Sequence, residues 1–445
     1  MKYVAGFFVI MTTSEHYHNC LKEMYGLRRF GIKLGLSTIK HILGRLGNPQ
    51  DQYNCIHVAG TNGKGSVAAM LASVMNVAGY RTGLYTSPHL VKFNERIAIN
   101  SQPIANERVI QTYEQIKQEH HGRREPTFFE FTTAMALLEF GQQKVQWAVI
   151  ETGMGGRLDA TNVIQPALSI ITNVSLEHRE YLGRTIREIA GEKAGIIKAQ
   201  TPVITGARQK HALSVIHAVA DTRSAPVYRL GNDFRTRRHS SGTFTYYGMD
   251  HTWYGLEAGL LGRHQVDNAA MVLAACEVLG RKSVGISQEQ IREGLLQTRW
   301  PGRLEIVCRD PIVMLDGAHN LAAARSLAGF LSSHLNRRDI TLVIGILDDK
   351  PYRAMLQTLV PVCQRVVLTQ PRIDRRLPAQ TLLPIVKEFT EDVTVVPDVR
   401  EAVLSAIKAA GAKKAVCIAG SLYVVGEAKE ALEAINFPCG PAGAQ

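Results

Sequence analysis

One segment constrains the fold of this chain more than any other: a glycine-rich loop between a strand-like run and a helix-like run. Cys55–Gly60 is a short apolar run of the kind that forms buried strands, and Ser66–Ala78 carries apolar residues at helical spacing. Residues 57–66, which span the junction, read HVAGTNGKGS. A strand, a glycine-rich loop and a helix in this order predict an α/β sheet with an anion-binding site at its edge.

The loop has the features of a site for nucleotide phosphates. Its glycines, Gly60, Gly63 and Gly65, allow the backbone to approach an anion and to turn N–H groups toward it. Lys64 would reach the outer phosphates, and Ser66 could face a metal ion. The loop departs from the strict Walker A pattern GxxxxGK[ST], because valine replaces the first glycine and glycine follows the lysine. The alternative is a glycine-rich turn with a solvated lysine.

The α/β pattern continues after the loop. Trp147–Glu151 and Leu168–Thr172 are predicted to be buried strands, and Thr185–Ile197 and His264–Leu279 are predicted to be helices. Residues 221–260 are richer in Tyr, Thr, Arg and Gly, which predicts short antiparallel strands.

A linker and a second, smaller α/β domain are predicted next. Thr298–Gly302 contains Trp-Pro-Gly, which interrupts the pattern and is typical of a connection between domains. Beyond it, strands separated by helical segments are predicted at Thr341–Leu347, Arg365–Thr369, Val393–Val396 and Ala415–Ala419.

Composition narrows the class of partner. The net charge of +12 is compatible with nucleic acid or with small polyanions such as nucleotides. Because the chain has neither a long basic block nor a nucleic-acid-binding module, small molecules are the predicted partners, not nucleic acid. The seven cysteines form no CxxC pair, which argues against a disulfide framework or a zinc site and favours a reducing compartment. No run reaches the about 18 apolar residues that span a bilayer, so we expect a cytoplasmic protein without membrane contact.

Further motifs follow the loop in a characteristic order. They are YTSPHLVKFNERI (85–97), ETGMGGRLDATNV (151–163), LEH (176–178), EKAGI (192–196), WPGRLE (300–305), LDGAHN (315–320) and GSLY (420–423). Together with GTNGKGS they resemble the motifs of the folylpolyglutamate synthase/dihydrofolate synthase family, within the Mur ligase superfamily. The resemblance extends from about Tyr25 to Gly426, and the motifs are specific mainly through their shared order and spacing. One small departure is that many members have LDH where this chain has LEH, which keeps the carboxylate and the histidine.

The resemblance implies the fold and its division. It implies a Mur-ligase-like P-loop ATPase domain with a mostly parallel sheet over residues 1–297, with a disordered tail as one reading of residues 1–20. A linker at 298–302 is followed by a smaller Rossmann-like glutamate-ligase domain over 303–445.

The resemblance also implies the activity. It implies an ATP-dependent ligase that adds L-glutamate to folate-type carboxylates through an acyl-phosphate, forming tetrahydrofolylpolyglutamates and also converting dihydropteroate to dihydrofolate. It implies ATP and two Mg²⁺ ions as ligands, carbamylation of Lys193, and a monomer.

Residue roles are carried over from the matching motifs. Binding of ATP is assigned to Gly60, Thr61, Asn62, Gly63, Lys64, Gly65, Ser66, Asn268, Arg303, Asp316 and His319. The metal ligands are Ser87, Glu151 and His178. The acceptor is surrounded by Thr127, Phe128, Phe129, Glu130, Leu158, Asp159 and Ala160. Lys64, His178, Lys193 and Arg303 are expected to contribute directly to catalysis.

Several of these residues also fit a structural role. Glu151 ends a buried strand where α/β proteins place ligands, but it could be a helix cap or an ion-pair partner. His178 alone would be better explained as an ordinary core or surface histidine, because Mg²⁺ prefers oxygen. Arg303 could close onto phosphates or form a hinge salt bridge. In the second domain, Lys350 and Arg372–Arg376 could meet the carboxylates of glutamate or form a solvated face.

Two rival functions stay open. Another Mur-type enzyme, such as a cell-wall amino-acid ligase, would carry an additional N-terminal domain, and a phosphate loop that begins near residue 57 leaves little chain for one. A non-catalytic nucleotide-dependent switch would explain the loop but not the acceptor motifs around Thr127 and Asp159. The sequence does not decide between acceptance of dihydropteroate, of folylglutamates, or of both.

Overall fold

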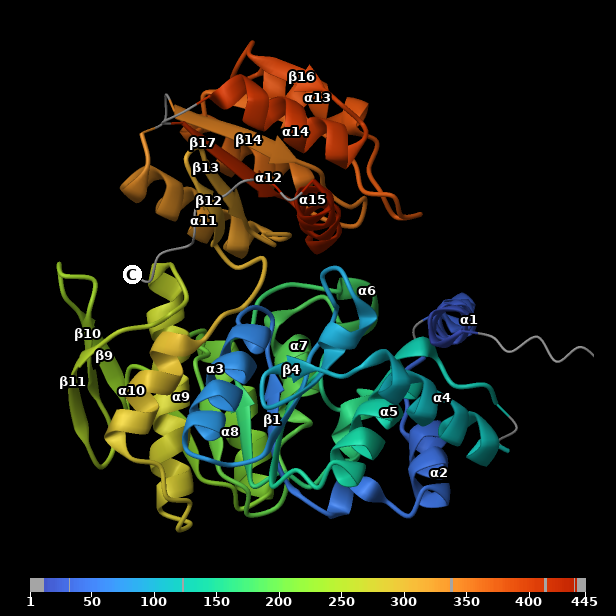
Figure 1. Cartoon of the computed structure of the whole chain (residues 1–445). Coiled ribbons are helices and arrows are strands. Elements are labelled where there is room, and N and C mark those ends of the chain that lie inside the picture. Colours follow the sequence, from blue (N-terminus) through green and yellow to red (C-terminus); the bar gives the residue numbers. More distant parts are fainter. Residues whose placement is uncertain are drawn as a thin grey trace, which may run out of the picture.

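The computed structural model describes residues 12–31, 33–121, 124–336, 339–411, 414–435 and 437. They form a larger N-terminal domain and a smaller C-terminal domain, which lie one above the other in Figure 1. The apolar segment 1–10 and Cys439 lie outside the described residues.

The larger domain is built on an eight-stranded sheet with the order β4-β3-β2-β5-β1-β6-β7-β8. Its strands are β1 (Asn54–Ala59), β2 (Thr82–Tyr85), β3 (Ile97–Ile99), β4 (Gln102–Pro103), β5 (Trp147–Glu151), β6 (Leu168–Ile171), β7 (Val203–Thr205) and β8 (Val227–Arg229). The six strands from β2 to β8 are parallel, and β3 and β4 add an antiparallel edge. This is the mostly parallel sheet that the sequence predicted.

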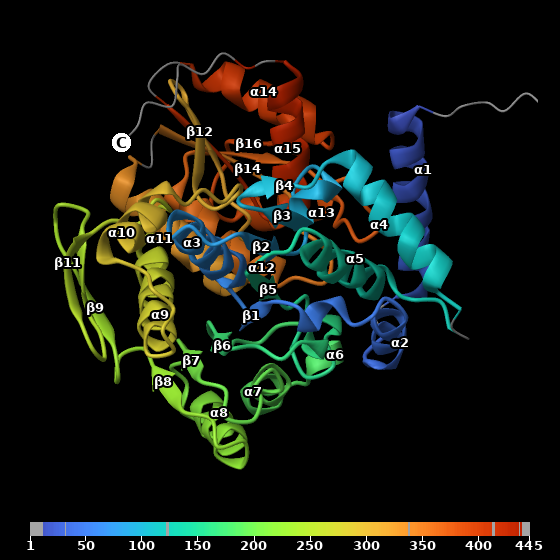
Figure 2. The same ribbon diagram turned by 60° about the horizontal axis from the view of Figure 1, so that its bottom comes forward.

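Helices cover both faces of this sheet, as Figure 2 shows. One face packs on α3 (Lys64–Val77), α9 (Arg263–Gly280) and α10 (Gln288–Gln297). The other face packs on α1 (Thr13–Gly26), α2 (Ser37–Arg45), α4 (Asn106–Glu119), α5 (Phe128–Gln142), α7 (Ile186–Ala194) and α8 (Lys210–Thr222). Alternate residues of each strand enter opposite cores: Ile56 and Val58 face α3, whereas Cys55 faces α5. The strands therefore read as continuous apolar runs because both of their faces are buried.

Two sequence predictions for the larger domain are wrong in part. Residues 13–20 are not a tail, because they form the first turns of α1 and bury Tyr17 and Cys20. Within 221–260, β9 (Arg235–Arg238), β10 (Phe244–Tyr247) and β11 (Thr252–Leu256) form the predicted antiparallel sheet. However, β8 pairs in parallel with β7 and extends the main sheet, and residues 221–222 still belong to α8.

The smaller domain has a six-stranded sheet with the order β12-β13-β17-β14-β15-β16, in which only the β12–β13 pair is antiparallel. Its strands are β12 (Glu305–Arg309), β13 (Ile312–Leu315), β14 (Ile340–Ile344), β15 (Arg365–Leu368), β16 (Val393–Val395) and β17 (Ala415–Ala419). One face packs on α11 (Leu321–His334), α12 (Tyr352–Leu359) and α13 (Ala379–Lys387), the other on α14 (Val399–Ala410) and α15 (Leu422–Ala434).

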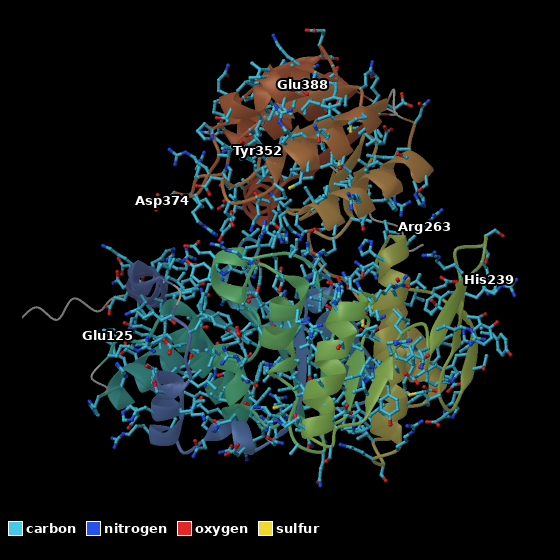
Figure 3. All side chains as sticks on the ribbon, turned by 180° about the vertical axis from the view of Figure 1, so that it is seen from behind. Glu125, His239, Arg263, Tyr352, Asp374 and Glu388 are labelled. Carbon is cyan, nitrogen blue, oxygen red and sulfur yellow. The ribbon has the colours of Figure 1, made fainter. Side chains whose placement is uncertain are left out.

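The two domains meet along the edge of the larger sheet that carries its functional loops. Residues 298–304 connect α10 to β12 and cross between the domains. Figure 3 shows Arg263, at the start of α9, at the end of the larger domain that is nearest to the smaller one. No helix in the described part of the chain is long and apolar enough to cross a membrane. The six described cysteines are all free thiols.

Candidate functional site

The candidate site lies at the carboxyl ends of neighbouring parallel strands. The loop after β1 carries the glycine-rich sequence, and the loops after β2, β5 and β6 carry Ser87, Asp159 and His178. Adjacent strands deliver these loops to one edge of the sheet, which is the usual ligand position in open α/β sheets.

The glycine-rich loop requires glycine for both conformation and space. Gly63 precedes α3 with a φ of +84°, in the left-handed region that favours glycine. A Cβ atom on Gly63 would lie 2.6 Å from Oδ1 of Asn268, and one on Gly65 would lie 2.9 Å from Nε1 of Trp300. Asn268 comes from α9 and Trp300 from the linker, so elements distant in sequence form the walls of the loop.

The loop is held in shape from the side of β6. The amide of Asn62 donates to Oδ1 of Asn173 at 2.9 Å, and the Thr172 hydroxyl donates to the carbonyl of Asn62 at 2.7 Å. The Thr61 amide donates to the carbonyl of Asn173 at 3.1 Å. These three hydrogen bonds connect the glycine-rich loop to the residues that follow β6.

Lys64 turns its side chain back over the loop. Its Nζ donates to the carbonyls of Gly60 at 2.9 Å and Thr61 at 3.3 Å. Ser66, by contrast, is 2% exposed and accepts a hydrogen bond from Gln265 of α9 at 3.3 Å, so its hydroxyl faces a neighbouring helix. In this arrangement Lys64 is the loop side chain that lies next to the anion position.

Glu151 and Ser87 lie together at the ends of β5 and β2. The Ser87 amide donates to Oε2 of Glu151 at 3.1 Å, and the Glu151 side chain forms no other hydrogen bond within the described part of the chain. Burial raises the pKa of Glu151, and the nearby Lys64 ammonium group offsets part of this effect. Glu151 is thus a buried carboxylate near a cation, and its second oxygen has no hydrogen-bond partner among the described residues. These features fit a ligand of a metal or phosphate site better than they fit a residue that caps a helix.

Lys193, in the last turn of α7, contacts the LEH segment that follows β6. Its side chain has no exposed area, and its Nζ donates to Oε1 of Glu177 at 2.6 Å. Burial lowers the pKa of Lys193 to about 8, although Glu177 acts in the opposite direction. Glu177 itself is one of the functional candidates that the sequence analysis did not single out, although it stood inside the LEH motif.

His178 begins the short helix α6 (Arg179–Leu182) with a φ of +41°. Burial lowers its pKa, while the adjacent Glu177 raises it and Lys350 of the second domain lowers it further. His178 therefore lies within electrostatic reach of both domains.

Glycines allow two motifs to pack against each other around Lys193. A Cβ on Gly156 would lie 2.9 Å from the carbonyl of Glu192, and one on Gly195 would lie 2.4 Å from Cα of Arg157. Arg157 in turn pairs with Glu192, with 2.8 Å between Nη2 and Oε1. The ETGMGGR and EKAGI motifs thus form one packed unit that fixes the end of α7.

The second domain supplies Arg303, Asp316, His319 and Asn320. Asp316 is 8% exposed and accepts the amides of Leu304 and Ala318, both at 2.9 Å, so it fixes the chain next to Arg303. Arg303 forms no ion pair among the described residues, so this arrangement shows no sign of the alternative role as a hinge salt bridge. Asn320 donates to Oδ1 of Asn62 at 2.8 Å and so ties the second domain directly to the glycine-rich loop.

His319 presents a nitrogen to this junction. Its Nδ1 lies 2.8 Å from the carbonyl oxygen of Gly317, which places a proton on Nδ1 and leaves Nε2 as an acceptor. Burial, followed by the charge of Arg303, lowers its pKa to about 4. His319 is therefore neutral at physiological pH.

The predicted acceptor segment begins α5. Thr127 caps this helix in a reciprocal pair with Glu130, whose carboxylate also pairs with Arg124. Asp159 accepts from the amide of Met154 at 2.9 Å and from Thr161, and Ala160 and Leu158 flank it. Both carboxylates thus have internal partners, which gives them at least a structural role. The rings of Phe128 and Phe129 are half-buried and leave an aromatic surface beside Gly153.

The basic residues of the second domain divide into two groups. Lys350 pairs with Asp349 at 2.8 Å and acts on the pKa of His178, so it faces the larger domain. Arg372 pairs with Asp398, and Arg375 lies 3.8 Å from Asp349. Figure 3 shows Asp374, between them, at the border of the smaller domain.

Comparison with known proteins identifies both domains. Residues 58–276 match the Mur ligase middle domain, and residues 302–422 match the Mur ligase glutamate ligase domain. A dihydrofolate synthase/folylpolyglutamate synthase of Bacillus subtilis is 36% identical over 430 residues, which cover 94% of this chain and 99% of that protein. The folylpolyglutamate synthase of Lacticaseibacillus casei is 39% identical over 349 residues, covering 76% of this chain and 81% of that protein.

Solved structures agree with these sequence matches. E. coli FolC in complex with DHPP and ADP is 30% identical and superposes with a TM-score of 0.87, covering 94% of this chain and 98% of that one. A folylpolyglutamate synthase from Thermotoga maritima is 37% identical, with a TM-score of 0.83, and covers 95% of this chain and 98% of that one. These matches span both domains and the junction between them, and the chain therefore belongs to the folylpolyglutamate synthase/dihydrofolate synthase family of Mur ligases.

Proposed function

We propose that this protein is an ATP-dependent ligase that joins the amine of L-glutamate to the carboxylate of a folate-type acceptor. The observation that carries this proposal is the preorganised glycine-rich loop, with Lys64 beside the buried Glu151 and with Asn320 of the glutamate-ligase domain bonded to Asn62. The glycine-rich loop, the buried carboxylate and the second domain thus meet at one place. Ligation in two steps requires this, because the carboxylate that is activated must then react with glutamate in the same site.

The chemistry requires an activated carboxylate. A carboxylate does not react with an amine at neutral pH, because oxide would have to leave. An acceptor oxygen therefore attacks the γ-phosphorus of ATP, and ADP leaves with the electrons of the broken P–O bond. The glutamate nitrogen then attacks the acyl carbon, phosphate leaves, and the nitrogen loses a proton. Lys64 and the N-terminal end of α3 are positioned to stabilise the negative charge of the phosphoryl group during the first step.

Magnesium is proposed to bind through Ser87, Glu151 and His178. The fit is best at Glu151, because one of its carboxylate oxygens has no partner in the described part of the chain and Ser87 adjoins it. A bound magnesium ion would neutralise phosphate charge during transfer. Glu177, which neighbours His178, accepts a hydrogen bond from the Nζ atom of Lys193.

The remaining ATP contacts are proposed to come from Asn268, Arg303, Asp316 and His319. Asn268 packs on Gly63, Asp316 fixes the backbone at Leu304, and Asn320 of the second domain donates to Asn62 of the loop, so groups from both domains border the loop. The guanidinium of Arg303, which has no ion-pair partner among the described residues, and Nε2 of neutral His319 are the groups proposed to contact the nucleotide. Closure of the domains would exclude water from the acyl-phosphate.

The acceptor is proposed to lie along Thr127, Phe128, Phe129 and Glu130, facing Leu158, Asp159 and Ala160. The half-buried side chains of Phe128 and Phe129 provide aromatic surface that suits a flat heterocycle. Lys350 is the proposed contact for incoming glutamate, because it faces His178 across the junction.

Product analysis tests this function and its range. Purified protein is incubated with ATP, Mg²⁺ and L-glutamate, and with dihydropteroate, tetrahydrofolate or a cell-wall precursor as acceptor. We expect products one or more glutamyl residues heavier from the first two acceptors, with one ADP released per bond. Release of ADP only with the cell-wall precursor, or without any ligated product, would reject the proposal.

Replacing Glu151 by Gln is expected to raise the magnesium concentration needed for half-maximal activity and to lower turnover. An amide is a weaker ligand for Mg²⁺ than a carboxylate, but it has almost the same shape. Magnesium titrations at saturating ATP measure the effect, with Glu139→Gln as a control for a buried carboxylate that pairs with Arg108 far from the loop. An unchanged titration would assign Glu151 a structural role.

Replacing Arg303 by Ala is expected to lower kcat by on the order of 10²-fold, the scale of a preorganised donor to developing charge. Because Arg303 makes no ion pair among the described residues, the free energy of unfolding should change by only about 0.5 kcal/mol. Steady-state kinetics and thermal denaturation separate the two effects. A large drop in melting temperature with normal kcat would show that Arg303 stabilises the hinge instead.

A further inference from the structure

Two arginines lie on the same aromatic ring at the border of the proposed acceptor site. The Cζ atoms of Arg28 and Arg96 lie 4.9 Å and 5.1 Å from the ring centroid of Phe128. Arg28 also lies 4.3 Å from the ring centroid of Tyr25, whose ring is 5.5 Å from that of Phe128. Aromatic faces attract guanidinium groups but do not neutralise them, so two like charges are held close together.

His89 completes a group of donors. The Nε–H of Arg96 donates to Nδ1 of His89 at 2.7 Å, so the ring proton of neutral His89 is on Nε2. That nitrogen lies 3.4 Å from the hydroxyl of Tyr25. Arg28, Arg96 and His89, hereafter the donor cluster, therefore combine two guanidinium groups with a ring N–H whose nearest partner is the Tyr25 hydroxyl.

Among the described residues, the donor cluster has no carboxylate partner. Arg96 is only 5% exposed, yet neither it nor Arg28 forms an ion pair with any acidic residue in the described ranges. A buried cation without a counter-charge costs stability, which a protein generally accepts only where a ligand supplies the charge. The cluster therefore has the charge and the donors of a carboxylate-binding site.

The position of the cluster shows which part of the site it serves. Ser87, at one end of the segment 87–96, contacts Glu151, and Arg96, at the other end, contacts the ring of Phe128. The segment therefore connects the proposed metal site with the acceptor surface. Its middle touches the second domain, since a Cβ on Gly426 would lie 2.1 Å from the carbonyl oxygen of Leu90. Arg96 also lies within electrostatic reach of Tyr423 in α15. A carboxylate held here would belong to a molecule that lies beside Phe128, close to where residues 87–96 contact the second domain.

We propose that Arg28, Arg96 and His89 bind an α-carboxylate of the γ-linked glutamyl chain carried by the acceptor. This inference rests on the proposed function. Each glutamyl residue of a folate tail carries one α-carboxylate, whereas dihydropteroate has none apart from the reacting group. The cluster therefore distinguishes glutamylated acceptors from dihydropteroate and contributes to how far the chain is extended. The α-carboxylate of incoming L-glutamate has the same chemistry and is the competing source.

The test compares acceptors with and without a tail. Arg28→Gln, at an exposed position, and Arg96→Gln are assayed with dihydropteroate, tetrahydrofolate and tetrahydrofolyl-tri-γ-glutamate. We expect kcat/KM to fall about ten- to hundredfold for the glutamylated acceptors, the scale of one charged hydrogen bond, and to stay within about twofold for dihydropteroate. Products made from tetrahydrofolate should also become shorter. Arg45→Gln, which removes an exposed ion pair with Glu119, is the matched control and should behave as wild type.

Binding measurements make the test independent of turnover. Calorimetry with p-aminobenzoyl-tri-γ-glutamate and with p-aminobenzoate should show tail-dependent binding to the wild type that Arg28→Gln weakens about tenfold or more. If the wild type ligates glutamate to no acceptor, the proposed function fails. The calorimetry would still show whether the donor cluster binds the glutamyl tail, because it measures binding without turnover. Equal losses with dihydropteroate and tetrahydrofolate would overturn the inference and assign the arginines to the support of Phe128. A raised KM for L-glutamate with unchanged acceptor binding would overturn it in favour of the incoming amino acid.

Discussion

Replacing Lys64 by Ala is expected to lower kcat by on the order of 10²–10³-fold with every acceptor, even at saturating ATP. The ammonium group of Lys64 now lies on the carbonyls of Gly60 and Thr61, within the loop that would hold the phosphates. When a phosphoryl group moves, this charge and the end of α3 balance the oxygens that gain negative charge. Because the reaction of every acceptor begins with activation of its carboxylate, dihydropteroate and folates should be affected alike.

A second variant shows whether the loss of any lysine charge, rather than of Lys64 in particular, lowers the rate. Lys387→Ala removes a cation at the exposed end of α13 and should keep normal kinetics. Steady-state rates of ADP release over a range of ATP concentrations provide the measurement. Near-normal turnover of Lys64→Ala at saturating ATP would show that the loop is a glycine-rich turn with a dispensable lysine, and the assignment of the phosphate site would then fail.

The local part of the fold could be predicted because it follows from short-range patterns. β5 and β17 have the predicted bounds, since each is an apolar run buried on both faces. The start of α1 was missed because its first half is mostly polar and its buried Tyr17 and Cys20 are too few to stand out. β8 was mistaken for part of an antiparallel sheet because strand direction depends on pairing with a distant strand, here β7.

Only those parts of the site that lie within a recognisable sequence motif could be predicted. The glycine-rich loop was evident, but its walls were not, since Asn320 and Trp300 reach it from the second domain and the linker. The pair formed by Glu177 and Lys193 joins the loop after β6 to the end of α7, a contact that exists only in the tertiary fold. Similarly, Arg28 and Arg96 are 68 positions apart and share a ring only through the tertiary fold. Spacing along the chain contains no information about such contacts.

Lys193→Ala is expected to be nearly inactive, and small carboxylic acids are expected to restore part of its activity. We propose that Lys193 is carbamylated and that its carbamate serves the metal–phosphate site. The side chain is fully buried, 2.6 Å from Glu177, and burial lowers its pKa to about 8. Only the neutral amine adds carbon dioxide: nitrogen bonds to carbon, and the nitrogen gives up a proton to solvent. At a fixed concentration of dissolved carbon dioxide, modification should therefore increase as the pH rises through about 8.

The carbamate would place a second anion beside Glu177, so it should persist only when a cation also binds. We expect ¹³C-bicarbonate to give a carbamate signal in NMR spectra that strengthens with Mg²⁺ and nucleotide. Lys193→Ala should lack the signal, and Lys198→Ala, which removes another partly buried lysine with a lowered pKa, should keep it.

Rescue decides between the two possible charges of Lys193. If the side chain acts as an anion, formate or acetate should raise the rate of Lys193→Ala and should not help Lys64→Ala, where a cation is missing. If Lys193 acts as an ammonium group that contacts phosphate directly, methylamine should rescue it and the acids should not. Its hydrogen bond to Glu177 alone is compatible with either state, because a metal ion could take the place of the lost ammonium charge. A crystal structure with magnesium and nucleotide bound, grown with ample bicarbonate and showing a bare ammonium group at Lys193, would refute the carbamate.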